Sequence, residues 1–276
     1  MRLATIRLDG RTAAARIDDD IATLLDHADV GELLADPDWR ARAAGPGQTR
    51  TVAPADYATL IPRPEKIICL GLNYRTHIAE MGRDTPRYPT LFAKYSGALI
   101  GGHDDIVLPV VSRDVDWEAE LGVVIGRPGR HIRHEDALAH VAGYTVVNDV
   151  TVRDYQHRTR EFLSGKTFEH TTPVGPVLVT AEEFGDAEPD LEMVCAVDGE
   201  VMQRARTSDL LFGVRDIISY VSDIITLRPG DLIATGTPGG VGAGRSPKVF
   251  LTEGQVLTTS IERLGTQRNV CVPEKV

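Results

Sequence analysis

The chain has 276 residues, of which 42% are hydrophobic and 25% charged, and its formal net charge is −10. This acidic balance argues against a nucleic-acid or anionic-membrane surface, because both recruit basic residues. Three widely spaced cysteines without a CxxC pair argue against a disulfide scaffold or a thiolate zinc site, and no run of about 18 apolar residues predicts a membrane span. The first eleven residues carry charges where a secretory signal would be apolar, so we expect a cytoplasmic protein.

Residues 1–62 predict a small N-terminal module. Apolar alternation on either side of Asp9-Gly10 indicates a β-hairpin over residues 2–17. Apolar spacing near 3.6 predicts short helices over 21–36 and 37–45. Proline and glycine interrupt residues 45–66, so we place a boundary near residue 62, with a larger domain over 63–276.

Short, β-branched segments dominate the larger domain. Two helices are expected, over 134–141 and over 207–225, the second capped by Thr207 or Ser208. Many strands without strict alternation with helices argue against a doubly wound sheet or a TIM barrel. The expected class is α+β, predominantly β. The expected strands are 67–72, 105–109, 120–126, 142–149, 175–180, 193–202, 231–236 and 256–265.

Two glutamates stand in VDWEAELGVVIG, residues 115–126. On a strand, Glu118 and Glu120 share a face and lie about 6.6 Å apart. A solvent-facing strand is the ordinary interpretation, but the unbroken apolar run that follows indicates a strand that enters the interior. A second strand ends in Asp149. If the three carboxylates meet, they suit Mg²⁺, Mn²⁺ or Ca²⁺ rather than zinc, although spacing alone does not require this.

Arg153 and Gln156 follow Asp149 at +4 and +7. A helical turn there would place all three on one face, although the β-branched residues between them weaken a helix. The alternative for Arg153 is a weak surface ion pair with Asp154 or Glu161.

His77 and Glu80 follow a predicted strand and become i, i+3 neighbours if Asn73 caps a helix. A carboxylate bonded to an imidazole prepares it to take a proton from water near neutral pH, whereas the alternative is an ordinary surface pair. The polar, proline-broken segment 81–90 is either a mobile lid or a plain loop.

Lys94 and Lys166 are isolated cations in apolar or small-residue segments. Near a pocket they would bind an anionic substrate, and otherwise they are ordinary surface lysines. The glycine-dense segment GTPGGVGAG, 236–244, lacks the GK[ST] ending of a phosphate loop. It supports at most a turn or an amide nest that holds a carboxylate.

Taken together, these segments resemble the fumarylacetoacetate hydrolase family. The matching pieces occur in order between about residues 62 and 272: GLNYRTHIAE, LFAKYSGALIGGHDDIVLP, VDWEAELGVVIG, GYTVVNDVTVRDYQ, GKTFEHTTPVGP and GTPGGVGAG. The resemblance implies a mixed β-roll catalytic domain in a short, single-copy member, a divalent metal that is usually Mg²⁺, and a homodimer. It also implies roles for nine residues: metal ligands Glu118, Glu120 and Asp149, a water-activating dyad His77 and Glu80, a substrate-polarising Lys166, and substrate-site residues Arg153, Gln156 and Thr237.

The sequence departs from the family pattern at two places. Thr76 stands where an acidic or amide residue often precedes the histidine, and His170 and Thr171 replace a typical FDTFCPxGP-like stretch. Because these changes affect pocket shape, they concern which substrate is bound rather than the metal chemistry.

The resulting hypothesis is Mg²⁺-dependent hydrolysis of a C–C bond in a small anionic 1,3-dicarbonyl or acylpyruvate-like acid of the fumarylacetoacetate or fumarylpyruvate type. Water activated by His77 and Glu80 would attack a carbonyl, and the metal would stabilise the departing enolate. The first alternative uses the same site to decarboxylate an oxaloacetate-like acid, or to isomerise or hydrate a 2-oxo-dienoate. The second is a β-domain with structural Ca²⁺ that only binds a partner.

Overall fold

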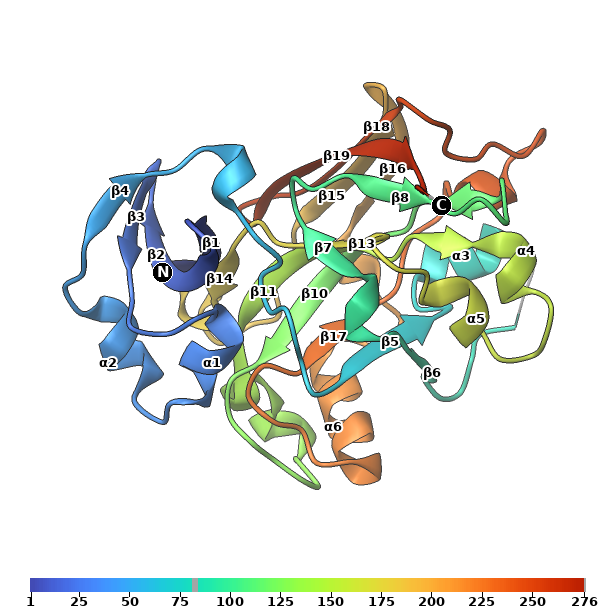
Figure 1. Cartoon of the computed structure of the whole chain (residues 1–276). Coiled ribbons are helices and arrows are strands. Elements are labelled where there is room, and N and C mark those ends of the chain that lie inside the picture. The colour runs from blue at the N-terminus through green and yellow to red at the C-terminus, as the bar shows by residue number, and fades with distance from the viewer. Residues whose placement is uncertain (81–83, 276) are drawn as a thin grey trace.

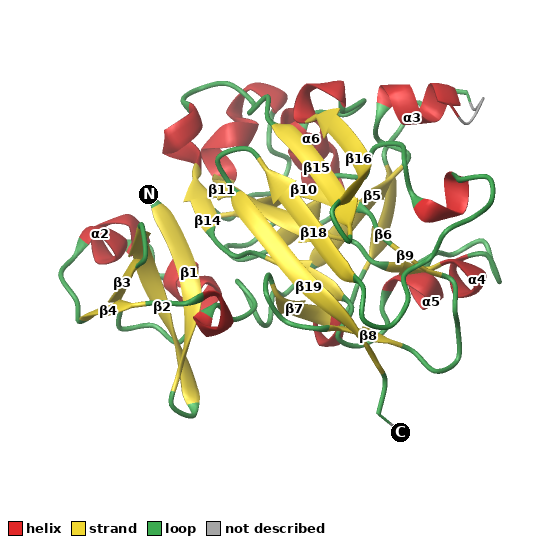
Figure 2. Cartoon of the chain, turned by 90° about the horizontal axis from the view of Figure 1, so that it is seen from above, coloured by secondary structure: helices red, strands yellow, loops and turns green. Residues whose placement is uncertain are grey.

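The computed structural model describes the backbone of residues 1–80 and 84–275, and all their side chains except those of His77, Ala79 and Glu80. Strands make up most of its regular structure, and they are organised in three sheets (Figures 1 and 2). The α+β, predominantly β class expected from the sequence is confirmed.

The largest sheet has twelve strands and runs through the whole molecule. Its order is β4-β3-β2-β1-β14-β11-β10-β17-β5-β6, and β13 pairs with both β11 and β7. The bounds are β1 Arg2–Leu8, β2 Arg11–Asp18, β3 Ile21–Leu24, β4 Thr49–Thr51, β5 Ile67–Gly71, β6 Thr90–Ala93, β7 Leu99–Gly101, β10 Ala119–Ile125, β11 Val141–Asn148, β13 Thr172–Val174, β14 Leu178–Thr180 and β17 Leu232–Ala234.

Two smaller sheets complete the strand structure. A five-stranded sheet has the order β16-β15-β18-β19-β8, and β9 pairs with β12 alone. Their bounds are β8 Ile106–Leu108, β9 Val115–Asp116, β12 Thr151–Val152, β15 Glu192–Val197, β16 Glu200–Arg206, β18 Val256–Ile261 and β19 Gly265–Pro273.

The helices are short. None of those in the described residues is long and apolar enough to cross a membrane. The α-helices are α1 Val30–Ala35, α2 Trp39–Ala44, α3 Arg75–Glu80, α4 Arg153–Gln156, α5 Leu163–Lys166 and α6 Val214–Ile224. The 3-10 segments are Pro54–Asp56, Ser96–Ala98, His134–His140, Ala181–Phe184, Thr207–Asp209 and Gly242–Gly244.

The N-terminal residues form one side of the molecule, where β1–β4 and α2 lie together in both views, with α1 beside them in Figure 1 (Figures 1 and 2). The predicted hairpin is present as β1 and β2. β1 also pairs with β14, with Leu3 opposite Leu178, so these residues extend the main sheet. The boundary near residue 62 stays a prediction.

The helix expected over 21–36 is wrong in its first part. Ile21–Leu24 is strand β3, which pairs with β2, and the helix begins only at Val30. Asp29 caps it by accepting a hydrogen bond from the backbone N–H of Glu32 at 2.9 Å. Pairing with a neighbouring strand therefore decides the conformation of a run too short to hold a helix alone.

The start expected for the helix over 207–225 is also wrong, because α6 begins at Val214. Glu188 caps it from a distant loop, accepting from the backbone N–H groups of Val214 and Arg215 at 2.8 and 2.9 Å. Thr207 instead accepts from the Leu191 N–H at 2.9 Å. This cap could not be recognised from sequence, since its carboxylate lies 26 residues away.

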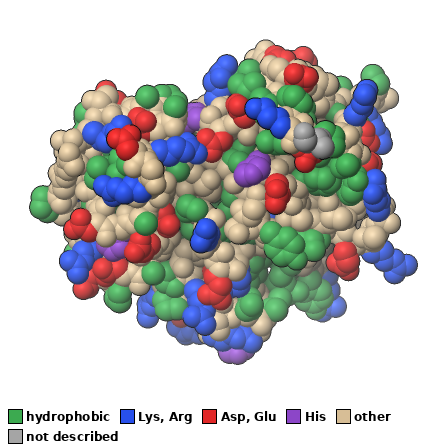
Figure 3. Space-filling view, viewed as in Figure 1, with side chains coloured by type: hydrophobic (Ala, Val, Ile, Leu, Met, Phe, Trp, Pro, Cys, Tyr) green, Lys and Arg blue, Asp and Glu red, His purple; other side chains and the backbone are tan. Residues whose placement is uncertain are grey.

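β10 is buried on both faces and passes between two apolar clusters. Leu121 and Val123 pack in one cluster, whereas Val124 packs in the other. Figure 3 shows that Lys and Arg side chains are interspersed with Asp and Glu on one face of the molecule. Buried charged side chains gather inside, where β10 begins.

Candidate metal centre and pocket

The pairing of β10 with β11 brings the three carboxylates together. Ala119 lies opposite Asn148, and the Asp149 N–H donates to the Glu118 carbonyl at 2.8 Å. One ligand atom from each of Glu118, Glu120 and Asp149 lies within 4.8 Å of the other two. The register therefore joins residues that the sequence separates by about thirty positions.

All three carboxylates are buried, so the solvent-facing interpretation of the glutamate pair is wrong. Glu118 is 7% exposed, and Glu120 and Asp149 are fully buried. Glu120 Oε2 accepts from the Gly236 N–H at 2.8 Å. Its Oε1 has no hydrogen-bond partner among the described residues. A buried carboxylate oxygen without a partner is unfavourable unless a cation or a donor binds it.

Two lysines neutralise part of this charge. Lys166 Nζ lies 2.7 Å from both Glu118 Oε2 and Asp149 Oδ2. Lys94 Nζ lies 2.5 Å from Asp149 Oδ1 and also donates to the Val150 carbonyl at 3.2 Å. Glu120 receives neither lysine as an ion-pair partner among the described contacts.

The ionisation of the carboxylates follows from this arrangement. Burial, then the charges of Asp149 and Glu118, raise the pKa of Glu120 well above its usual range. Burial also acts to raise the pKa of Asp149, but Lys166 and Lys94 outweigh it and lower that pKa. Burial acts to lower the pKa of Lys166, and the opposing charges of Asp149 and Glu118 raise it overall. Lys166 is thus held as a cation, which makes it a donor rather than a base.

Arg153 connects the cluster to a fourth carboxylate that the sequence analysis missed. Its Nε lies 2.7 Å from Asp116 Oδ2, its Nη1 lies 2.6 Å from Glu118 Oε1, and Nη1 also donates to Gln156 Oε1 at 2.9 Å. The helical turn expected there holds only in part, because α4 carries Arg153 and Gln156 whereas Thr151–Val152 is strand β12, so Asp149 lies before the helix. The surface ion pair considered for Arg153 is not what the structure shows, since its side chain is buried.

Asp116 is held by the glycine-dense segment 236–244. Its Oδ1 accepts from the Gly242 N–H at 2.7 Å, and its Oδ2 accepts from the Ala243 N–H at 2.9 Å. A Cβ on Gly242 would lie 1.8 Å from the Val249 carbonyl oxygen, so only glycine fits. The amide nest expected from the sequence therefore holds carboxylates of the chain itself. Asp116 stands two residues before Glu118, and that spacing was the available signal.

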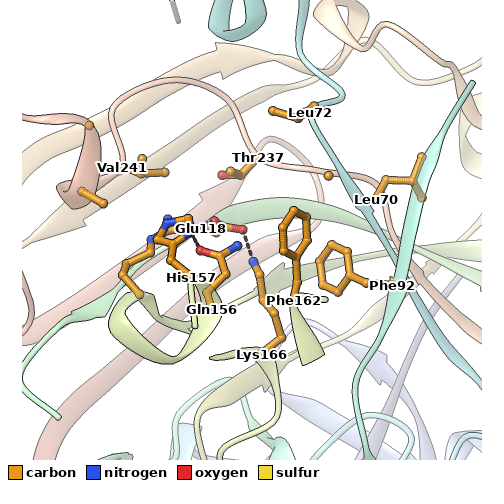
Figure 4. A pocket seen from close by; sticks show the side chains of 14 residues that line it. Leu70, Leu72, Phe92, Glu118, Gln156, His157, Phe162, Lys166, Thr237 and Val241 are labelled. Carbon is orange, nitrogen blue, oxygen red and sulfur yellow. Dashed lines mark hydrogen bonds and ion pairs between the residues drawn. The ribbon is translucent and has the colours of Figure 1, made fainter. Parts of the chain in front are cut away.

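A cavity of about 330 Å³ opens beside this cluster (Figure 4). Lys166 and Gln156 point toward Glu118 at its polar end. The hydroxyl of Thr237 accepts from Gln203 Nε2 at 2.8 Å and donates to the Ala119 carbonyl at 2.9 Å. The lining residues are Leu70, Gly71, Leu72, Phe92, Glu118, Arg153, Gln156, His157, Phe162, Lys166, Thr237, Val241, Ala243 and Gly244.

Not all of the predicted site residues line the cavity. Lys94 is paired with Asp149 but is not among the residues lining the cavity. His77 and Glu80 belong to α3, which begins three residues after Leu72, but their side chains lie outside the described part of the chain. The roles assigned to all these residues remain predictions. The apolar lining was not predicted, because its members are distant in sequence and resemble ordinary core residues.

A buried carboxylate cluster with cations beside it opens into a cavity within a sheet-dominated α+β fold, and this arrangement is a candidate active site. Residues 66–272 match the family model described as fumarylacetoacetate (FAA) hydrolase C-terminal. The chain belongs to the fumarylacetoacetate hydrolase family and is an enzyme of that group.

Relatives within this family carry out different reactions. The human protein named oxaloacetate tautomerase FAHD2A, mitochondrial, is 45% identical over 214 residues, which cover 77% of this chain and 68% of the relative. The solved fumarylacetoacetate hydrolase of psychrophilic Exiguobacterium antarcticum superposes with a TM-score of 0.88 at 32% identity, covering 99% of this chain and 100% of that one. A third match is maleylpyruvate hydrolase from Sphingobium sp. SYK-6, solved in complex with manganese(II) ion and pyruvate. It superposes with a TM-score of 0.80 at 29% identity, covering 100% of both chains.

Proposed function

We propose that the protein is a divalent-metal-dependent enzyme that interconverts the keto and enol forms of a small 2-oxo acid. The observation that carries the proposal is the buried cluster of Glu118, Glu120 and Asp149 at the polar end of the cavity. The 45% identity to an oxaloacetate tautomerase supports this reaction over others. In it, a C–H bond next to the oxo group breaks and an O–H bond forms on the oxo oxygen, so no oxidant or reductant is needed.

The residues present fit a hard divalent cation. The candidate ligands are all carboxylate oxygens, and Glu120 Oε1 is buried without a partner. We propose Mg²⁺ as the resident ion, with Mn²⁺ as a substitute and Ca²⁺ as a further possibility, since these ions prefer such ligands. When bound there, the ion supplies positive charge that withdraws electrons from the substrate's oxo group.

Charge balance supports an anionic substrate. With all four carboxylates ionised, the cluster and Asp116 carry one more charge than the three buried cations around them, Lys94, Lys166 and Arg153. A divalent ion reverses the sign of this excess. The loaded site then attracts one carboxylate of a 2-oxo acid.

The chain's own groups have distinct tasks in this reaction. Lys166 Nζ, kept protonated, donates a hydrogen bond to the oxygen on which negative charge develops. Arg153 lines the cavity and has a buried Nη2 without a partner in the described chain, so it is available to a substrate oxygen. We assign the proton at carbon to His77, oriented by Glu80, because a neutral imidazole exchanges protons near pH 7.

Ketonisation of enol oxaloacetate tests the proposal, followed by the loss of ultraviolet absorbance with Mg²⁺ or Mn²⁺ against an enzyme-free blank. We expect EDTA and Glu120→Gln each to remove the enzymatic rate, and His77→Gln to lower kcat by about 10²-fold or more. Asp231→Asn is the control, since Asp231 is a buried carboxylate that pairs with Lys66 and does not line the cavity. Full activity in EDTA would refute the proposal.

Hydrolysis of a C–C bond is the second candidate, and the structural similarity to maleylpyruvate hydrolase favours it. It uses the same cluster but adds a water molecule, which His77 and Glu80 would activate. The products separate the two reactions. An acylpyruvate that is split into pyruvate and an acid indicates hydrolysis, an unchanged carbon skeleton indicates tautomerisation, and CO₂ release indicates decarboxylation.

Two further properties expected at the sequence level are proposed here as well. One is a homodimer, which light scattering coupled to size-exclusion chromatography will test. The other is a cytoplasmic location, which fractionation will test. The human relative is named as mitochondrial.

A further inference from the structure

The cavity has a polar end and an apolar wall. Beside Lys166, Figure 4 shows the rings of Phe92 and Phe162. The two rings meet edge to face at a centroid distance of 5.8 Å. At about 330 Å³ the cavity lies at the small end of the range for small-molecule sites. The wall consists of Leu70, Leu72, Phe92 and Phe162, and Figure 4 shows Val241 on the other side of Thr237.

Among the described lining residues, the lysine and the arginine both serve the polar end of the cavity. Lys166 is paired with Glu118 and Asp149, and Arg153 with Asp116 and Glu118. The wall adds four apolar side chains. A second carboxylate on the far end of a substrate would lose hydration against this wall without gaining a charged partner from it. An apolar group placed there would be stabilised by burial.

Leu72 gives this wall an unusual feature. Its φ is +58°, a left-handed conformation that L-residues other than Asn and Asp rarely adopt. Glycine would adopt it without strain. Leu72 is half-buried and belongs to neither of the two core clusters, as is also true of Phe162. Core packing therefore does not explain why a leucine occupies this position, whereas its place on the cavity wall does.

We infer that the site selects 2-oxo acids whose far end is uncharged and apolar, such as acylpyruvates with an aliphatic or aryl acyl group, and that Leu72 and Phe162 set this selection. The inference rests on the proposed function, because the polar end must bind the 2-oxo acid group. On this inference, the chain prefers such a substrate to a dicarboxylic acid such as oxaloacetate.

Butanoylpyruvate and succinylpyruvate provide a matched pair of probes. Their carbon chains are equally long, and one ends in a methyl group where the other ends in a carboxylate. Loss of enol absorbance with Mg²⁺ gives kcat/KM for each, and chromatography identifies the products. We expect wild-type enzyme to prefer butanoylpyruvate by at least about tenfold, since burial of its terminal methyl is worth about fourfold and the terminal carboxylate of the other probe loses hydration in addition.

Leu72→Ala and Phe162→Ala should each lower kcat/KM for butanoylpyruvate by about tenfold and leave succinylpyruvate within about twofold. Leu72→Gly should lose the preference equally, yet be at least as stable to heat as Leu72→Ala because glycine relieves the backbone. Leu91→Ala is the matched control. Leu91 lies on β6, packs against the core and does not line the cavity. Its truncation should lower the melting temperature and keep the preference.

The outcomes separate the inference from the proposed function. No turnover of either acylpyruvate or of oxaloacetate with Mg²⁺ or Mn²⁺ would overturn both. Turnover of oxaloacetate but of neither acylpyruvate would overturn the inference alone. So would a wild-type preference for succinylpyruvate, or equal losses on both probes in Leu72→Ala.

Discussion

Glu120→Gln should stabilise the metal-free protein and remove its response to metal. Glu120 is fully buried, with Oε1 unpartnered and with Asp149 and Glu118 close by. Glutamine keeps the shape and still accepts from the Gly236 N–H, but it removes the charge. The penalty removed is about 1–3 kcal/mol, the usual cost of an unsatisfied buried polar group.

This stabilisation depends on pH in a defined direction. The pKa of Glu120 is raised above the usual 4.5, first by burial and then by its acidic neighbours. A carboxyl whose pKa is raised by folding favours the native state only while it is protonated, so wild-type stability falls as pH rises from about 4.5 through the folded pKa. Glutamine does not titrate. The two proteins should therefore be equally stable near pH 4 and diverge above it, with the variant the more stable.

Thermal melts in EDTA between pH 4 and 8 measure this difference. At about 2–4 °C per kcal/mol for a protein of this size, the variant should gain several degrees at high pH. Addition of Mg²⁺ or Mn²⁺ at a hundred times its Kd should stabilise wild type by about 2.7 kcal/mol and leave Glu120→Gln unchanged. Asp231→Asn, which leaves the carboxylate cluster unchanged, should keep the metal response. A metal-free variant less stable than wild type at every pH would refute the electrostatic argument.

Three further outcomes follow from buried groups. Thiol reagents at pH 8 should leave the native protein unlabelled and should modify every cysteine after denaturation. The reason is that burial raises the pKa of all three thiols, to about 12 for two of them. Rapid labelling of the native protein would contradict their burial. Asn73→Ala should cost about 2–4 kcal/mol in urea unfolding, because Asn73 makes three hydrogen bonds to backbone groups; a loss below about 0.5 kcal/mol would contradict this. Gly242→Ala should lower the free energy of unfolding by about 1–3 kcal/mol, because the added Cβ clashes with the Val249 carbonyl. Gly244→Ala should be nearly neutral, because a Cβ there would lie 3.6 Å from the nearest side-chain atom, on Val241. The three thiols are Cys69, Cys195 and Cys271.

Local patterns predicted much of the strand structure because period-2 alternation and Asp-Gly turns act within a few residues. The hairpin around Asp9-Gly10 and the strand ahead of Asp149 are present as expected. The predictions that were wrong depend on distant partners. Ile21–Leu24 became a strand because β2 offered an edge, and α6 begins where Glu188 reaches its N–H groups.

The sequence by itself determined which chemistry is available, since carboxylates without cysteine ligands restrict a metal site to hard cations. It also determined that 236–244 can hold a carboxylate. Only the tertiary structure decided that Glu118 and Glu120 are buried. It also decided that Asp149 lies beside them, because the register of β10 against β11 brings these residues together. It likewise decided that the segment 236–244 binds Asp116, and that Leu72 and Phe162 line the same cavity. Contacts between residues far apart in the chain depend on how the sheets close, and no local pattern records that.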